Sequence, residues 1–238
     1  AAAGRIVSFM KDQFGDAVTS DNPLIRMGFW PGGDRDGNPF VTADITVQVA
    51  DALRNAIIRC YYNDVRKLKR RATFDGVENV LNELEKKLYN SVFIPDNKLA
   101  ITQQEMLTTL RQIKETIVYQ HNGLFVDLVE NLINKVEVFG LHFASLDVRQ
   151  ESTVHGKVMD ALAGKTGGIP KDYPEMSEDE KIAVLTGINE KADPELLEKG
   201  VPKDTLLSVG AIKTIQQYSG AEGCDRYIIS QCNSALNV

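Results

Sequence analysis

The chain has 238 residues, of which 43% are hydrophobic and 25% charged, and its formal net charge is −6. This length is enough for one large or two small domains with a buried core. The acidic balance excludes a general affinity for nucleic acid, because binding a phosphate backbone requires a basic surface. No stretch approaches the roughly 20 apolar residues of a membrane span, so we expect a soluble protein with no membrane partner.

The first distinctive segment is a charged loop bounded by glycines. Phe29 to Pro31 are apolar and strand-like, and they lead into Gly32-Gly-Asp-Arg-Asp-Gly-Asn-Pro39. Glycines on both sides permit a sharp backbone path and the close approach of another group. Neighbouring side chains of an extended chain point to opposite sides, so each charge of Asp34 to Asp36 needs a partner from another segment, a metal or a ligand. A solvated Asp-Gly turn remains the alternative, whereas a calcium loop is excluded because its last ligand position is Ile45.

Four helices are predicted between residues 41 and 140, from apolar residues at helical spacing. The first has Thr42 as its cap, and the second begins at Asp75. Thr102-Gln-Gln-Glu105 matches a capping box and opens the third helix, while the fourth follows Gly123 and ends at Gly140. The four apolar stripes consist of Ile45, Val49, Leu53, Ile57 and Tyr61; Val77, Val80, Leu81, Leu84 and Leu88; Leu110, Ile113 and Ile117; and Leu124, Leu128, Leu132 and Val136.

The rest of the chain is predicted to hold two strands among further helices. Residues 141–148 alternate as a strand does and form the best strand candidate, and Tyr227 to Ile229 form a second, short one. Between them we predict a short helix over Val154 to Leu162, a helix opened by the capping box Ser177-Glu-Asp-Glu180, and a long helix from Asp204 to Tyr218. Helix therefore predominates, which is unusual for a complete α/β domain, where strands and helices alternate evenly.

We interpret this mostly helical pattern with a few short strands as part of a TIM-like α/β barrel that carries large helical insertions. Residues 1–238 are then a single segment of a larger barrel enzyme. Residues 1–140 hold the charged loop and a helical region, and residues 141–238 hold barrel strands with their connecting helices. The chain ends at Val238 without a polar tail, which we interpret as a cut within a longer protein.

The predicted strand at 141–148 leads directly into Arg149, Gln150 and Glu151. Barrel enzymes place their chemistry at the carboxyl ends of their strands. An arginine fixed there by a rigid strand can bind a phosphate or carboxylate through two parallel hydrogen bonds. The alternative is a structural ion pair of Arg149 with Asp147 or Glu151, because such pairs outnumber substrate arginines.

The histidines and cysteines carry no recognisable site. His121, His142 and His155 are each expected to be structural or exposed, despite the aptitude of histidine for proton transfer. The three cysteines are odd in number and widely spaced, which suits a reducing compartment, so we expect a cytoplasmic protein. Cys60 falls on an apolar stripe and is expected to be a buried, inert thiol.

Three blocks of the sequence together carry a family resemblance. The first runs from Trp30 through Thr46, and the second is Phe139-Gly-Leu-His-Phe-Ala-Ser-Leu-Asp-Val-Arg-Gln-Glu-Ser152. Tyr227 to Leu236 match more loosely, because Ala235 stands where an aspartate is usual. All three resemble signature segments of phosphoenolpyruvate carboxylases. The resemblance covers nearly the whole chain, although the proteins of that family are several times longer.

The resemblance implies an enzyme that joins phosphoenolpyruvate to bicarbonate, giving oxaloacetate and phosphate, and that assembles as a homotetramer. Phosphoryl transfer to bicarbonate would give carboxyphosphate and an enolate, and the enolate would attack the released carbon dioxide. A divalent metal, Mg²⁺ or Mn²⁺, would act as a Lewis acid. The family's catalytic histidine in a His-Pro-Thr-Glu motif, its metal ligands and its Gly-Arg-Gly-Gly loop are not found in the chain. We therefore expect no catalytic residue or metal ligand here, and no activity without the rest of the same polypeptide.

The resemblance also implies roles for single residues. Arg149 would bind the phosphate of phosphoenolpyruvate, and Trp30 and Arg35 would lie near the bicarbonate side of the site. Their supporting neighbours would be Asp34, Asp36 and Glu151. A rival hypothesis from another class is a non-catalytic helical scaffold or regulatory module that kept these blocks but lost the chemistry.

Overall fold

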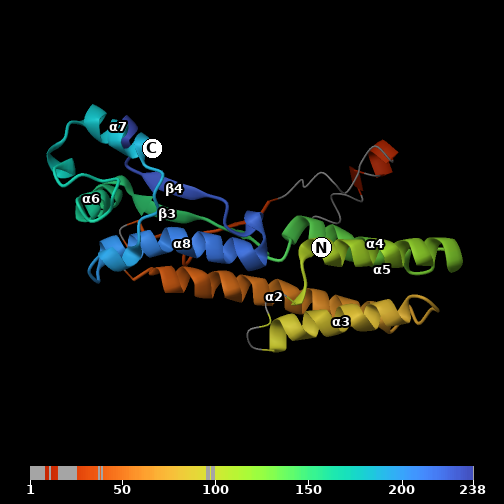
Figure 1. Cartoon of the computed structure of the whole chain (residues 1–238). Coiled ribbons are helices and arrows are strands. Elements are labelled where there is room, and N and C mark those ends of the chain that lie inside the picture. The colour runs from red at the N-terminus through yellow and green to blue at the C-terminus, as the bar shows by residue number, and fades with distance from the viewer. Residues whose placement is uncertain are drawn as a thin grey trace. The chain divides into compact units, whose positions relative to one another are not determined.

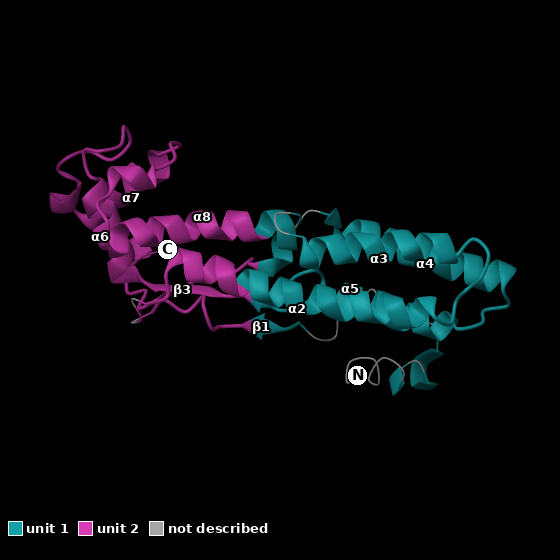
Figure 2. Ribbon diagram, turned by 90° about the horizontal axis from the view of Figure 1, so that it is seen from below, with its two compact units in different colours: residues 1–28, 50–145, 216–223 teal, residues 29–49, 146–215, 224–238 magenta. Residues whose placement is uncertain are grey.

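A computed structural model describes residues 9–10, 12–15, 26–36, 38, 40–94, 97 and 100–237 of the chain (Figure 1). The chain divides into two compact units (Figure 2). Unit 1 contains residues 1–28, 50–145 and 216–223, and unit 2 contains residues 29–49, 146–215 and 224–238. Two long helices, α2 (Ala43–Lys69) and α8 (Val201–Ser219), begin in unit 2 and end in unit 1.

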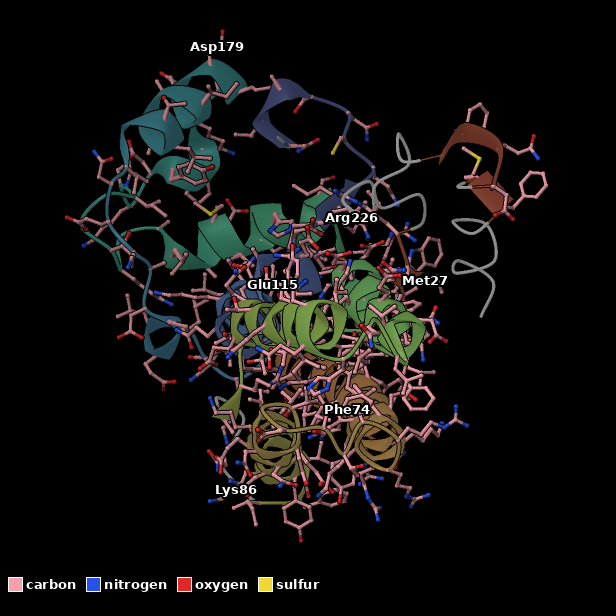
Figure 3. All side chains as sticks on the ribbon, turned by 90° about the vertical axis from the view of Figure 1, so that its right-hand side faces the viewer. Met27, Phe74, Lys86, Glu115, Asp179 and Arg226 are labelled. Atoms are coloured by element: carbon pink, nitrogen blue, oxygen red, sulfur yellow. The ribbon has the colours of Figure 1, made fainter. Side chains whose placement is uncertain are left out.

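Unit 1 consists of helices around one hydrophobic core. Besides the C-terminal part of α2, it contains α3 (Glu78–Phe93), α4 (Gln103–Gln120) and α5 (Val126–Phe139). The buried stripes of these helices meet in a cluster of aliphatic side chains, and Phe74, labelled in Figure 3, packs against that cluster. Burial of these side chains supplies the main stabilisation of the unit. The four helices predicted between residues 41 and 140 are confirmed.

Local sequence signals explain where two of the helices start. The hydroxyl of Thr102 accepts a hydrogen bond from the N–H of Glu105 at 3.1 Å, and the Glu105 carboxylate accepts one from the N–H of Thr102 at 2.9 Å. Ser177 and Glu180 form the same reciprocal pair in front of α7 (Glu178–Gly187). Each pair satisfies backbone N–H groups that a helix N-terminus leaves without a partner. Both predicted capping boxes are confirmed.

The buried face of α2 differs from the predicted one in its first half. The predicted stripe began at Ile45, which is 37% exposed, whereas Thr46 and Arg54 are buried. The Thr46 hydroxyl donates to the carbonyl of Gly32 at 2.7 Å, and the Arg54 guanidinium donates to the hydroxyl of Ser91 at 3.3 Å. Polar side chains with such partners can occupy buried positions that a hydrophobicity pattern assigns to the surface.

The strand predicted over residues 141–148 is wrong in its first half. Helix α5 ends at Gly140, and Phe143 takes the left-handed backbone conformation with φ of 67°, which a regular strand does not allow. The N–H of Phe143 donates to the carbonyl of Phe139 at 2.8 Å and closes a turn after the helix. Strand geometry begins only at β2 (Ser145–Leu146) and continues in β3 (Val148–Glu151).

The strands of unit 2 are parallel and are joined through helices. Strand β3 pairs in parallel with β4 (Tyr227–Ser230), and Arg149 stands opposite Ile228. Between the two strands the chain passes through α6 (Ser152–Leu162), α7 and α8. A parallel bridge joins Arg149 to Asp34 as well, and the N–H of Asp147 donates to the carbonyl of Phe29, the last residue of β1 (Gly28–Phe29), at 3.0 Å. Parallel strands connected through helices are the building unit of α/β folds.

A second hydrophobic core lies in unit 2 between α6 and the segments that follow it. Its buried side chains are Val158, Leu162, Ile169, Tyr173 and Leu197. The fold is thus mostly helical with a few short strands, as predicted, whereas the barrel remains a prediction. None of the helices in the described part of the chain is long and apolar enough to cross a membrane.

Candidate functional site

The end of β3 and the charged loop lie side by side in unit 2. The N–H of Arg149 donates to the carbonyl of Gly33 at 2.9 Å, and the N–H of Arg35 donates to the carbonyl of Arg149 at 3.1 Å. Gly33 permits this approach, because a Cβ there would lie 2.0 Å from the carbonyl oxygen of Asp147. The close backbone approach predicted for the loop is confirmed at this glycine. Gly37, at the other end of the loop, lies outside the described residues.

Two side chains of the charged loop, and Trp30 just before it, surround the guanidinium group of Arg149. Its Nη1 lies 3.6 Å from Oδ2 of Asp34, and its Nη2 lies 3.6 Å from Oδ2 of Asp36. Its guanidinium carbon lies 4.8 Å from the centroid of the Trp30 ring. Both ion-pair distances exceed the about 2.7–2.9 Å of a strong charge-assisted hydrogen bond, and the buried Nε has no hydrogen-bond partner among the described residues. The group is held in place and keeps donors for a ligand.

The structural ion pairs considered for Arg149 do not form. Asp147 instead accepts a hydrogen bond from Nε of Arg226, which Figure 3 labels, at 2.7 Å. Glu151, predicted to support the site, accepts a hydrogen bond from the hydroxyl of Thr153 at 2.7 Å. The carboxylates that Arg149 does face come from the charged loop.

Arg35 has a different set of partners from Arg149. Its side chain is 4% exposed, and its Nη2 forms an ion pair with Oδ2 of Asp204 in the first turn of α8. The other carboxylate oxygen of Asp204 accepts a hydrogen bond from the N–H of Ala43, the first residue of α2, at 3.2 Å. Nε and Nη1 of Arg35 are buried and have no partner among the described residues. Asp34 and Asp36 thus pair with Arg149, whereas Arg35, which lies between them, pairs with Asp204. The prediction that neighbouring charges of the loop take their partners from other segments is confirmed.

A cavity of about 530 Å³ lies beside Arg35. Its walls come from the charged loop, the N-terminal ends of α2 and α8, and the carboxyl end of β3. The polar residues that line it are Arg35, Asn38, Thr42, Gln150, Glu151 and Asp204. Helix N-termini carry partial positive charge, and the Arg35 guanidinium adds a full one. The lining thus combines one guanidinium and two helix N-termini with the carboxylates of Glu151 and Asp204, so it offers both donors and acceptors to a small polar ligand.

A histidine–tyrosine pair occupies the same unit. A ring nitrogen of His155 on α6 lies 3.0 Å from the hydroxyl of Tyr227 on β4. Burial lowers the pKa of His155, and the positive charge of Arg35 lowers it further. Burial raises the pKa of Tyr227. His155, expected to be structural or exposed, is half-buried and electrostatically coupled to a predicted site residue.

Sequence reasoning missed Asp204 and Tyr227 as neighbours of the predicted site. Asp204 was assigned only to a helix start, and Tyr227 only to a short strand. The sole available signal was that the unpaired charge of Arg35 required a carboxylate from a distant segment. Nothing in a single sequence identifies which of the many acidic residues that is.

The other histidines and cysteines take structural or surface positions. His121 stacks on Phe74 with ring centroids 4.6 Å apart, and His142 is 9% exposed. The prediction for Cys60 is wrong: this thiol is exposed, because the buried face of α2 is turned away from it. Cys224 is the buried thiol, and burial raises its pKa to about 12.

Across the described ranges, no three His, Cys, Asp or Glu side chains are grouped so that they could hold a metal ion. The acidic residues of the site are instead engaged with arginines and backbone groups: Asp34 and Asp36 with Arg149, and Asp204 with Arg35 and Ala43. The residues present therefore do not fit a metal centre. We predicted that the ligands of a catalytic metal come from the rest of the polypeptide, and this stays a prediction.

Comparisons with a family profile and with individual proteins identify the same family. A family profile described as phosphoenolpyruvate carboxylase matches residues 2–94 and 77–238. The phosphoenolpyruvate carboxylase of Vibrio atlanticus is 29% identical over 256 residues, which cover 96% of this chain and 29% of the relative. That of Trichormus variabilis is 27% identical over 261 residues, covering 89% and 25%, and that of Synechocystis is 26% identical over 293 residues, covering 96% and 28%. The chain thus spans 25% to 29% of the length of these relatives.

Proposed function

The chain belongs to the phosphoenolpyruvate carboxylase family. From this premise we propose that it is the part of such an enzyme that binds the phosphate group of phosphoenolpyruvate. The whole enzyme would join phosphoenolpyruvate to bicarbonate and release oxaloacetate and phosphate. A bound Mg²⁺ or Mn²⁺ would supply Lewis-acid stabilisation of the enolate. The described residues offer no ligand cluster for such an ion, so the role proposed for this chain involves no metal.

The position of Arg149 carries this proposal. Arg149 is the second residue of β3, and its backbone is fixed by its hydrogen bond to Gly33 and by pairing with β4. The carboxyl end of β3, where α/β enzymes bind substrates, follows two residues later. Its side chain is 22% exposed, so a ligand can reach it, and part of its N–H donors remain without a partner. A phosphate group can replace the long ion pairs with short charge-assisted hydrogen bonds.

We assign the residues around Arg149 to its orientation. Asp34 and Asp36 each face a different Nη atom, which fixes the rotation of the guanidinium plane. The Trp30 ring covers one face of that plane, so a ligand can approach from an edge but not from that face. Edge-on approach is the geometry in which guanidinium binds phosphate bidentately.

The bicarbonate side of the site is proposed at Arg35. The unpartnered Nε and Nη1 of Arg35 can donate to two acceptor oxygens, and the positive ends of α2 and α8 favour an anion in the same cavity. The carboxylate of Glu151 also lines the cavity and can accept the hydroxyl proton of bicarbonate in a hydrogen bond. Arg149 would then bind the phosphate of phosphoenolpyruvate, and Arg35 would bind bicarbonate.

Catalysis itself requires groups that we place outside this chain. The proton-transferring histidine and the metal ligands would come from the rest of the same polypeptide, so the 238-residue chain alone is proposed to be inactive. A cytoplasmic location and a homotetrameric parent enzyme are part of the same proposal. The location is inferred from the number and spacing of the cysteines, and the homotetramer from the family resemblance.

The test is an assay of the full-length polypeptide with Mg²⁺ for bicarbonate-dependent formation of oxaloacetate. In that enzyme, Arg149→Ala should lower turnover by roughly 100-fold or more with unchanged folding. Arg111→Ala serves as the matched control, because Arg111 pairs with Glu137 on the helical surface of unit 1. Near-normal kinetics of Arg149→Ala would exclude its role. Absence of oxaloacetate formation in the unmodified enzyme would favour the scaffold hypothesis.

A further inference from the structure

One carboxylate joins three segments of unit 2 that are distant in the sequence. Asp204, in the first turn of α8, pairs through Oδ2 with Arg35 of the charged loop and accepts through Oδ1 from the N–H of Ala43 at the start of α2. We propose that Asp204 is a positioning residue, which fixes the guanidinium of Arg35 at the wall of the cavity proposed for bicarbonate. This inference rests on the proposed function and adds a residue to it.

Arg35 needs such a partner for two physical reasons. Its side chain is 4% exposed, and a buried guanidinium without a counter-charge is strongly unfavourable. Its four side-chain torsions would also give the group several orientations, and ordering them on ligand binding would weaken binding. Asp204 supplies the charge and fixes one end of the guanidinium in the unliganded protein.

Asp204 engages only one end of the Arg35 guanidinium. Asp204 occupies Nη2 only, while Nε and Nη1 stay buried without a partner among the described residues. Both Arg35 and Asp204 line the cavity of about 530 Å³. The ion pair therefore holds the arginine without using all the donors that a bicarbonate oxygen would need.

The hydrogen bond to Ala43 makes Asp204 itself rigid. A negative charge at a helix N-terminus is stabilised by the helix dipole, and Asp204 lies at this end of both α2 and its own helix α8. Two helices of 27 and 19 residues are thereby fixed to the charged loop. A single change at Asp204 should loosen the loop at Arg35 while leaving β3 and Arg149 intact.

The decisive variant is Asp204→Asn in the full-length enzyme. Asparagine is isosteric and keeps a carbonyl oxygen for the N–H of Ala43, but its NH₂ group cannot accept from Arg35. We expect the KM for bicarbonate to rise roughly 10-fold to 100-fold, as for the loss of one charge-assisted contact. The KM for phosphoenolpyruvate should change by less than about threefold, because Arg149 has other partners.

Two further variants separate positioning from general damage. Asp204→Glu keeps the charge and should restore much of the bicarbonate affinity. Glu195→Gln is the matched control, because Glu195 forms an exposed ion pair with Lys203 in the same turn as Asp204; it should leave both KM values unchanged. An Asp204→Asn enzyme with an unchanged KM for bicarbonate, or with equal losses for both substrates, would overturn the proposal.

A second measurement is independent of catalysis. We would compare the thermal unfolding of Arg35→Gln, Asp204→Asn and the double variant. If the pair is coupled as proposed, the double variant loses less in melting temperature than the sum of the two single losses, because no unpaired charge is left buried. Additive losses would refute the coupling even in an active enzyme. Coupling in a protein without carboxylase activity would instead show that the proposed function has failed while the structural link stands.

Discussion

The guanidinium carbon of Arg149 lies 4.8 Å from the centroid of the Trp30 ring, so that a tryptophan of the charged loop segment covers an arginine of a distant strand. Trp30 is 54% exposed and has no core-packing role that would explain the contact. An arginine over an aromatic face gains about 0.5–2 kcal/mol and loses orientational freedom. The contact therefore links Trp30 to the phosphate side of the proposed site as well as to the loop.

We predict that Trp30→Ala raises the KM for phosphoenolpyruvate by roughly 2-fold to 30-fold, the equivalent of that cation–π energy. Trp30→Phe should keep most of the affinity, because phenylalanine retains a π face. Steady-state kinetics with each substrate varied in turn would measure the effect. A rise confined to the KM for bicarbonate would contradict this prediction and would favour the placement of Trp30 on the bicarbonate side that family resemblance implies.

The helices were predictable from the sequence because their signals are local. The capping boxes at Thr102 and Ser177 and the apolar stripes of α3 to α5 each lie within a few turns of one helix. The strand over residues 141–148 was misplaced because Phe143 in a left-handed conformation has no composition signal. Alternating apolar residues in a tight turn look the same as those in a strand.

The candidate site was predictable only in part, because its contacts are non-local. The sequence indicates that the charges at Asp34, Arg35 and Asp36 need partners on opposite sides. It also predicts Arg149 just after a strand, whereas Arg149 is the second residue of β3. It does not indicate that the partners of Arg149 are the loop carboxylates themselves, or that Asp204, 169 positions from Arg35, completes the other side. Pairings over such separations are set by the packing of α8 and β3, which a local pattern does not encode.

Two glycines should respond to alanine in opposite directions. A Cβ at Gly33 would lie 2.0 Å from the Asp147 carbonyl oxygen, so Gly33→Ala must displace the loop from β3. Gly156, within α6, has no atom within 4 Å of an added Cβ. We expect Gly33→Ala to lower the free energy of unfolding by roughly 2 kcal/mol or more, and Gly156→Ala to raise it by about 0.5–1 kcal/mol. Urea unfolding of both variants measures this, and destabilisation by Gly156→Ala would contradict the open surroundings described for α6.

The cysteines should differ in reactivity toward a thiol reagent such as a disulfide dye. Cys60 and Cys232 are exposed, whereas Cys224 is buried and its pKa is raised to about 12 by burial. Because the thiolate is the reactive form, Cys224 should stay unmodified in the native protein and react only after unfolding. The folded chain should therefore release two equivalents of dye and the denatured chain three. The Cys60→Ser variant should reduce the native count to one, and an unchanged count would mean that Cys60 is buried after all.

His155 should make the stability of the protein depend on pH. Its pKa is lowered in the folded state by burial and by the nearby charge of Arg35, and it contacts the neutral hydroxyl of Tyr227. A histidine of this kind binds its proton more tightly in the unfolded chain, so the unfolded state gains protons first as the pH falls. The stabilisation is complete above the unfolded pKa of about 6.5 and is lost as the pH drops from there toward the folded value.

We therefore expect the free energy of unfolding to fall more between about pH 7.5 and about pH 5 for the unmodified protein than for His155→Gln. The glutamine variant keeps a polar side chain that can reach the hydroxyl of Tyr227 but does not titrate. Urea titrations at both pH values give the comparison. Equal slopes for the unmodified protein and His155→Gln would mean that acidic groups, whose protonation also destabilises folded proteins at low pH, account for the whole dependence.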